Sequence, residues 1–265
     1  MFEILSYEFM QRALLGGIII STASALIGVF LVLKRLSLLG DSLAHASFGG
    51  IALGFVTGWN PLLTALAFVT LASLGIDRLV NKLKVYGESA IALMLSFGMA
   101  LALLLIGIAK KMDYNIFSYL FGSILTINSF DIALAATVLA LILIFYFFNY
   151  KILLYSAFNQ DIALVRNKRT KLIDKLFIML SAVTIVISIR AVGILLISAL
   201  LVIPALIGLR LSKSFKSTIF IAILSSICGV LLGIFLAYYF DLPAGGTIVM
   251  SLLFLFVLSL FFGRK

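Results

Sequence analysis

Long apolar runs separated by short polar segments fill this sequence of 265 residues from end to end. A run of about 20 apolar residues is long enough to cross the hydrocarbon core of a bilayer as one helix. Runs poor in charged residues predict about nine such spans. Their ranges are 13–33, 43–59, 61–79, 89–109, 129–149, 172–189, 192–210, 217–239 and 244–262. The pattern therefore predicts an all-α fold, a polytopic transmembrane helical bundle of about 8–9 spans, with 1–265 as a single membrane domain.

Two stretches depart from this pattern. Between the fourth and fifth spans, the apolar part of DYNIFSYLFGSILTINSF covers only 116–127 and contains Ser, Asn and Gly. It is too short to span, so we expect a short interfacial or re-entrant helix there. The segment at about 150–175 is the longest polar one, and it predicts a loop outside the hydrocarbon core.

The composition agrees with a membrane protein, since 64% of the residues are hydrophobic and only 11% are charged. The mean hydropathy is +1.28. The first residues, MFEILSYEFMQRALL, lack the basic region and the small-residue cleavage site of a signal peptide, so we expect them in the mature protein. The single cysteine, Cys228, excludes an intramolecular disulfide and a site built from several cysteines.

The net charge of +10 comes from 20 basic and 10 acidic residues, and its distribution along the chain indicates topology. If the loop at 150–175 is cytoplasmic, alternating sides leave only Arg12, Lys110, Lys111 and Arg190 outside, and the other sixteen basic residues inside. Such an excess on one side is typical of the cytoplasmic face. We therefore expect a multi-pass protein of the cell membrane with its N-terminus outside and its C-terminus in the cytoplasm. The same distribution removes the reason to expect nucleic acid as a partner.

The segment GDSLAHASFGG holds the only histidine of the chain, His45, four residues after Asp41. On a helix the two side chains share one face, near the cytoplasmic end of the second span. A neutral imidazole and a carboxylate suit borderline divalent metals such as zinc, manganese and iron. The alternative is structural, with Asp41 capping the helix and His45 packed through one hydrogen bond. An ionisable pair in a span favours a functional site, but the residues alone leave both interpretations open.

Other polar residues of the spans have simpler interpretations. Glu88 opens the fourth span, where a carboxylate favours the helix dipole. Asp241 and Pro243 lie between the last two spans on the outer side, where they form a turn or line an outer mouth. Pro204 can kink the seventh span.

Catalytic and nucleotide-binding motifs are absent from the sequence. It contains no G-x-x-x-x-G-K-[ST], H-E-x-x-H or G-x-S-x-G. We therefore do not expect an enzyme. Transport against a gradient needs energy and this chain has no nucleotide site, so a transport subunit of this kind would need a partner that supplies the energy through the basic cytoplasmic face.

Taken together, several segments resemble the membrane permease subunit of zinc- and manganese-type ABC transporters. They are YEFMQRALLGG at 7–17, GVFLVLKRLSLLGDSLAHASFGGIALG at 28–54, YLFGSILTINSFD at 119–131, VGILLISALLVIPA at 192–205 and DLPAGGTIVM at 241–250. The resemblance implies a homodimer, two cytoplasmic ABC ATPase subunits and an extracytoplasmic metal-binding protein. It also implies that Asp41 and His45 are pathway ligands for the transported ion, zinc or manganese, with no permanently bound cofactor.

The resemblance further implies a cytoplasmic coupling helix in the 150–175 loop. Phe158, Asp161 and Ala163 match the family pattern Phe-Asp-x-Glu-x-Ala-x-x-x-Gly, whereas Asn159 and Asn167 depart from it. The predicted function is thus the pathway-forming subunit of an ATP-driven importer for zinc, manganese or iron. Two alternatives are a related permease for a larger solute, such as cobalamin or an iron chelate, and a self-sufficient secondary metal carrier.

Overall fold

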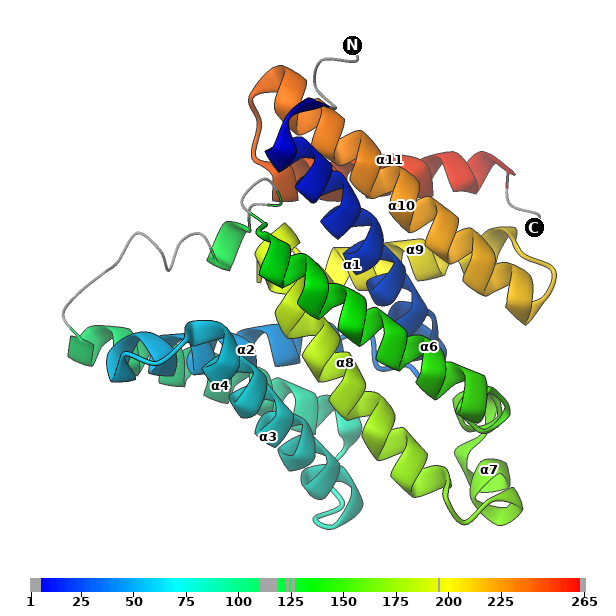
Figure 1. The fold of residues 1–265 in the computed structure, drawn as a ribbon. Coiled ribbons are helices and arrows are strands. Elements are labelled where there is room, and N and C mark those ends of the chain that lie inside the picture. Colours follow the sequence, from blue (N-terminus) through cyan, green and yellow to red (C-terminus); the bar gives the residue numbers. More distant parts are fainter. Residues whose placement is uncertain (1–5, 110–118, 123, 125–126, 195, 263–265) are drawn as a thin grey trace.

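The computed structural model describes residues 6–262, apart from 110–118, 123, 125–126 and 195, and it omits the side chains of Asn81, Gln160 and Asp161. All the regular structure of the described residues is helical, which confirms the predicted all-α class (Figure 1). The helices are α1 (Glu8–Leu33), α2 (Leu39–Thr57), α3 (Pro61–Asn81), α4 (Gly87–Ala109), α6 (Ser129–Phe158), α7 (Gln160–Arg166), α8 (Thr170–Val192), α9 (Ile197–Leu211), α10 (Phe215–Phe240) and α11 (Ala244–Phe262).

Local sequence sets several of the helix ends. Asn60 caps α3 by accepting a hydrogen bond from Leu62 N at 3.0 Å, and Pro61 follows at the first helical position. Asn128 and Asp131 form a reciprocal capping box at the start of α6. These caps satisfy backbone donors that would otherwise lack partners inside a membrane protein.

Seven of the described helices are long and apolar enough to cross a membrane: α1, α3, α4, α6, α8, α10 and α11. They correspond to seven of the predicted spans. The predicted span at 192–210 is instead the 15-residue helix α9, because Val192 still belongs to α8 and Gly193 ends that helix with φ +90°. The predicted span at 43–59 is α2, which begins four residues earlier, at Leu39.

Half of the predicted interfacial helix at 116–127 lies outside the described residues, and within the described half residues 119–121 are helical. The 150–175 loop contains the end of α6, all of α7 and the start of α8. It is therefore largely helical, and the short helix α7 lies where a coupling helix is expected.

Two groups of helices contact each other along α8. Helix α2 packs most closely against α3 and α4, and Figure 1 shows these three together on one side of the molecule. Helix α1 packs against α6, α9 and α10, while α11 packs against α10 and α9. Helix α8 contacts α6 and α1 of the second group as well as α3 and α2 of the first.

Two ion pairs mark opposite ends of α6 and α8. Arg190, in the last turn of α8, pairs with Asp131 in the first turn of α6. At the other end of the same helices, Lys34 of α1 pairs with Asp174 of α8. Lys34 and Arg190 thus lie at opposite ends of the bundle, as the charge-based topology requires.

Candidate functional site

Glycines bring the neighbouring helices into backbone contact with α2. A Cβ atom added at Gly98 of α4 would lie 2.5 Å from Ala46 Cα and 2.7 Å from the carbonyl oxygen of His45. One added at Gly50 of α2 would lie 2.7 Å from Ala65 Cα of α3. Small residues permit this close approach between membrane helices. The position of the segment around His45 is therefore set by direct contact with α3 and α4.

Asp41 and His45 are the only residues of 39–52 that are not buried. Their spacing of four places them on one side of α2, so this part of the helix is partly exposed on that side alone. Asp41 and His45 therefore lie on one face of α2, as their spacing predicts. Both side chains lie in the first two turns of α2, as predicted for the end nearer to Lys34.

The partners of the two side chains differ. Ser198, in the first turn of α9, donates its hydroxyl to Asp41 Oδ1. His45 Nδ1 is buried and has no hydrogen-bond partner within the described part of the chain. Helix α2 begins after Leu38 without a side-chain cap, so Asp41 is not the N-cap residue. The structural alternative of a capping Asp41 with a hydrogen-bonded His45 therefore does not describe this site.

A carboxylate oxygen and a free imidazole nitrogen can both bind a borderline divalent metal. Among the residues that the structure describes, no group of three or more His, Cys, Asp or Glu side chains lies close enough to hold a metal ion. A structural zinc site generally uses four protein ligands. Asp41 and His45 of one chain therefore fall short of that number of ligands.

The remaining predicted polar residues lie apart from this pair. Glu88 is exposed in the first turn of α4, as expected for a carboxylate at a helix N-terminus. Asp241 ends α10 in the left-handed conformation with φ 51°, and Pro243 precedes α11; both are exposed. The structure thus shows a tight turn at 241–243, and its role as an outer mouth stays a prediction.

In the 150–175 loop, the two asparagines that depart from the family pattern lie at the two ends of α7. Asn159 caps α7 by accepting a hydrogen bond from Ile162 N at 3.1 Å. The Asn167 side chain accepts one from Arg169 N at 2.8 Å, which closes the turn into α8. Both departures are therefore compatible with a short, well-defined helix.

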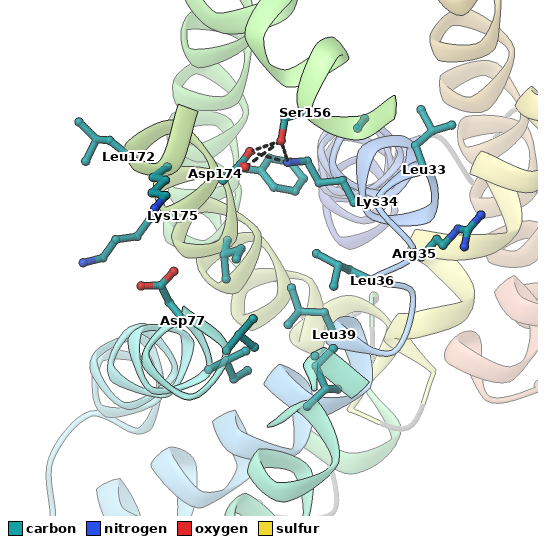
Figure 2. A pocket seen from close by; sticks show the side chains of 18 of the residues that line it. Leu33, Lys34, Arg35, Leu36, Leu39, Asp77, Ser156, Leu172, Asp174 and Lys175 are labelled. Atoms are coloured by element: carbon teal, nitrogen blue, oxygen red, sulfur yellow. Dashed lines mark hydrogen bonds and ion pairs between the residues drawn. The ribbon is translucent and has the colours of Figure 1, made fainter. Parts of the chain in front are cut away.

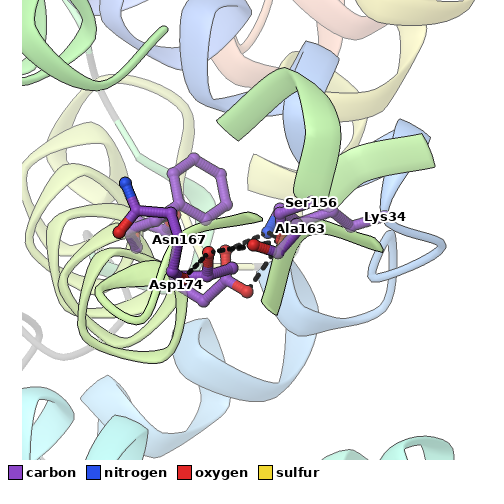
Figure 3. Close-up of polar contacts among 8 residues, drawn as sticks. Lys34, Ser156, Ala163, Asn167 and Asp174 are labelled. Atoms are coloured by element: carbon purple, nitrogen blue, oxygen red, sulfur yellow. Dashed lines mark hydrogen bonds and ion pairs between the residues drawn. The ribbon is translucent and has the colours of Figure 1, made fainter. Parts of the chain in front are cut away.

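The two sides of α7 have different surroundings. Ala163 is buried against α8, where the hydroxyl of Thr170 donates to the carbonyl oxygens of Ala163 at 2.9 Å and Asn167 at 2.7 Å (Figure 3). Phe158, the last residue of α6, is 72% exposed, and the side chain of Asp161 is outside the described part of the structure. Among the predicted coupling residues, Ala163 therefore anchors the loop while Phe158 is available to a partner.

Two further exposed apolar residues were not predicted from the sequence. Ile162 is 60% exposed and Val165 is 91% exposed, and they lie three positions apart on one side of α7. Together with the exposed Phe158, we call them the apolar patch. The signal was present, since apolar residues recur four and seven positions after Phe158 in a polar segment. Large exposed apolar side chains outside the spans are typical of a protein interface.

A cavity of about 780 Å³ lies at the end of the bundle that carries Lys34 (Figure 2). Its walls come from α1, α3, α4, α6 and α8 and include the cationic residues Lys34, Arg35, Lys171 and Lys175 and the carboxylates Asp77 and Asp174. Leu39, two residues before Asp41, also lines it, but Asp41 and His45 do not. The cavity therefore approaches the pair from the basic end without reaching it.

Comparison with known proteins gives consistent results over nearly the whole chain. The family described as "ABC 3 transport family" matches residues 6–263. The manganese import system permease protein ScaB of Streptococcus gordonii is 33% identical over 264 residues, which cover 98% of this chain and 93% of that protein. The high-affinity zinc uptake system membrane protein ZnuB of Haemophilus influenzae is 28% identical over 255 residues, covering 96% and 98%.

A solved structure resembles this fold closely. PsaBC from Streptococcus pneumoniae in complex with Fab superimposes with a TM-score of 0.88 at 30% identity, over 99% of this chain and 94% of that one.

Proposed function

This chain belongs to the ABC 3 transport family, and we propose that it is the membrane-spanning subunit of an ATP-driven importer for a divalent transition metal. Membership confirms the resemblance to metal ABC permeases that the sequence motifs carry. Relatives described as manganese and zinc permeases match at similar identity, so we propose zinc or manganese as the cargo, with iron as a further candidate.

One observation carries the proposed site. The first turns of α2 are enclosed by protein except at Asp41 and His45, a carboxylate and an imidazole on one side of the helix, and the buried Nδ1 of the imidazole has no partner within the described residues. A buried nitrogen without a partner is costly unless something binds it. We propose that a metal ion reaching this side of α2 is bound by both side chains.

The incomplete ligand set supports a homodimer. A second copy of the chain facing this side of α2 would supply a second Asp41 and His45 and raise the number of protein ligands to the usual four. Two-fold assembly of identical chains is the commonest form of soluble oligomer, and it makes such a shared site symmetric.

We assign a different partner protein to each end of the bundle. The sequence has no P-loop, so we assign ATP hydrolysis to ABC ATPase subunits that bind the apolar patch of Phe158, Ile162 and Val165. Asp161 and Ala163 contribute to that coupling as loop residues. We place an extracytoplasmic metal-binding protein at the opposite end, near the turn of Asp241 and Pro243. In this orientation the N-terminus is outside and the C-terminus is cytoplasmic.

The test is metal uptake into liposomes by the complex of permease, ATPase and binding protein. His45→Ala and Asp41→Ala should each lower uptake more than about tenfold, since even groups that only support metal ligands are worth about 10–100-fold. Thr57→Ala is the matched control, because Thr57 lies on α2 but bonds only the carbonyls of its own helix. Competition among zinc, manganese and iron in the same assay identifies the metal.

Three outcomes would change this proposal. Normal metal uptake by both variants would remove Asp41 and His45 from the pathway and favour a larger solute, such as cobalamin or an iron chelate. Uptake without the ATPase would indicate a secondary carrier. A purified complex whose mass corresponds to a single permease chain per complex would contradict the homodimer.

A further inference from the structure

Three helices meet in a closed polar triangle at the end of the bundle that carries α7. Lys34, which follows α1, lies with its Nζ 2.5 Å from Oδ1 of Asp174 in α8. Ser156, near the end of α6, accepts a hydrogen bond from Lys34 Nζ at 2.8 Å and donates one to Asp174 Oδ2 at 2.7 Å. Figures 2 and 3 show the three side chains pointing toward one another. The triangle therefore joins α1, α6 and α8 through side chains alone.

The charges in this triangle are largely withdrawn from water. The Lys34 side chain is 9% exposed and that of Asp174 is 15% exposed, and the ring of Phe177 lies 5.6 Å from the ammonium. Desolvation offsets much of the attraction in such a pair, and apolar residues of similar volume often stabilise a fold equally well. Stability alone is therefore a weak reason for an ion pair here.

The triangle lines the cavity, but it is not arranged as a ligand site. The ammonium of Lys34 and both oxygens of Asp174 already have partners within the triangle. A solute in the cavity would have to displace these contacts before it could bind. The geometry favours a mechanical connection between helices.

On one side, the triangle is connected to α7. The buried hydroxyl of Thr170 bonds the carbonyls of Ala163 and Asn167, and Asp174 follows Thr170 by about one helical turn. Ser156 lies at the other end of the loop, two residues before Phe158. A displacement of α7 would therefore move both the α6 and the α8 corners of the triangle.

On the other side, the triangle is connected to the start of α2. After Lys34 the backbone forms a tight turn, with Arg35 at φ 58° and hydrogen bonds from Leu36 N to Leu31 O at 2.8 Å and from Leu39 N to Leu36 O at 2.9 Å. Asp41 follows two residues later. Because the turn is closed by its own hydrogen bonds, it can transmit a shift of Lys34 to the first turn of α2.

We propose that Lys34, Asp174 and Ser156 are positioning residues that transmit movement of α7 to the metal pair Asp41 and His45. This inference rests on the proposed function, in which α7 receives the ATPase. None of the three residues touches the metal. They hold the end of α1 to the coupling loop, so that ATP-driven displacement of the loop changes the position of α2.

The test uses a double variant that removes both charges and keeps the side-chain volumes, Lys34→Met with Asp174→Asn. Replacing both partners avoids leaving one charge buried and unpaired. In the complete complex with ATPase and metal-binding protein, we expect the metal transported per ATP hydrolysed to fall about tenfold, within the range that residues on a coupling route produce. The concentration of loaded binding protein at half-maximal uptake should not change, because the delivery end is distant.

The matched control is Arg190→Met with Asp131→Asn, which removes the ion pair that joins α8 to α6 at their opposite ends. It should leave the ratio of transport to hydrolysis within about twofold of the wild type, because the route to α2 stays intact. An equal loss in both double variants would indicate general loosening of α6 and α8 and would overturn the proposal.

A smaller change keeps the test decisive if the first double variant does not assemble. Ser156→Ala leaves the ion pair and removes one corner, and we expect the ratio to fall about two- to threefold. An unchanged ratio in Ser156→Ala, or in an assembled Lys34→Met/Asp174→Asn complex, overturns the positioning role alone. A wild-type complex that moves no divalent metal refutes the proposed function, and the positioning role with it.

Discussion

Replacing Gly98 with alanine tests how tightly α4 holds the segment of α2 that carries His45. The new Cβ would lie 2.5 Å from Ala46 Cα and 2.6 Å from its backbone nitrogen. Carbon atoms in good contact lie about 3.5–4.0 Å apart, so the two helices would have to separate by about 1 Å. Since the atoms in the way are backbone, no rotation of a flexible side chain can relieve the clash.

The magnitude follows from two opposing terms. Overpacking of this kind costs about 1–3 kcal/mol, whereas alanine in place of glycine inside a helix gains about 0.5–1 kcal/mol. Gly107 lies on the same helix and has no atom within 4 Å of its added Cβ, so Gly107→Ala provides the gain without the clash. The difference between the two variants therefore isolates the overpacking, about 1–3 kcal/mol.

Thermal melting of the detergent-purified chain, at one scan rate for all variants, measures this difference. A cost of 1 kcal/mol lowers Tm by roughly 2–4 °C in a chain somewhat smaller than this one, so Gly98→Ala should melt about 2–10 °C below Gly107→Ala. Gly98→Ala should also take up less metal, because the displaced backbone carries His45. Equal melting temperatures and equal uptake in the two variants would refute the close α2–α4 packing.

Three further predictions concern a helix junction, a cap and the coupling loop. Gly193→Ala should destabilise the chain by more than about 2 kcal/mol and so lower Tm and the yield of folded protein, since φ is +90° and the Cβ would lie 2.4 Å from Phe121 C. Gly246→Ala is the control, because its added Cβ has no atom within 4 Å, and it should leave Tm unchanged. Asn60→Ala should cost about 1 kcal/mol by removing the α3 cap, while Asn60→Ser should keep Tm near the wild type. Val165→Asp should weaken capture of the ATPase subunit about tenfold with unchanged melting, because Val165 is 91% exposed. Unchanged capture would contradict the docking role of the apolar patch.

The helical membrane fold was predictable because length and polarity alone define a spanning helix. What those criteria could not show is the break before α9. Gly193 and Gly122 both have positive φ, and a Cβ added at Gly122 would lie 2.2 Å from Gly193 N, so the two backbones meet directly. That contact joins segments 71 positions apart in the chain. A run of apolar letters from 192 to 210 contains no sign of it.

Within the candidate site, the pair Asp41 and His45 was predictable because a spacing of four is local information. Its partner Ser198 was not, since the contact crosses 157 positions of the chain. The same holds for Lys34, which charge counting assigns to one side of the membrane without indicating that Asp174, 140 positions later, lies beside it. Hydropathy and charge place residues along the membrane normal, whereas partners depend on which helices pack together.

Helix α2 is absent from the set of helices recognised as spans, and this absence has a physical cause. An ionisable side chain facing lipid costs several kcal/mol, so a membrane helix that carries Asp41 and His45 must be shielded by protein. Shielding on several sides requires close helix contacts, and Gly40, Gly49 and Gly50 provide them, while Ser42 donates a hydrogen bond to Ile91 O of α4. The same small and polar residues keep α2 out of the set of helices apolar enough to be recognised as spans. The small and polar residues that remove α2 from the set of recognised spans are therefore the ones that allow neighbouring helices to shield Asp41 and His45.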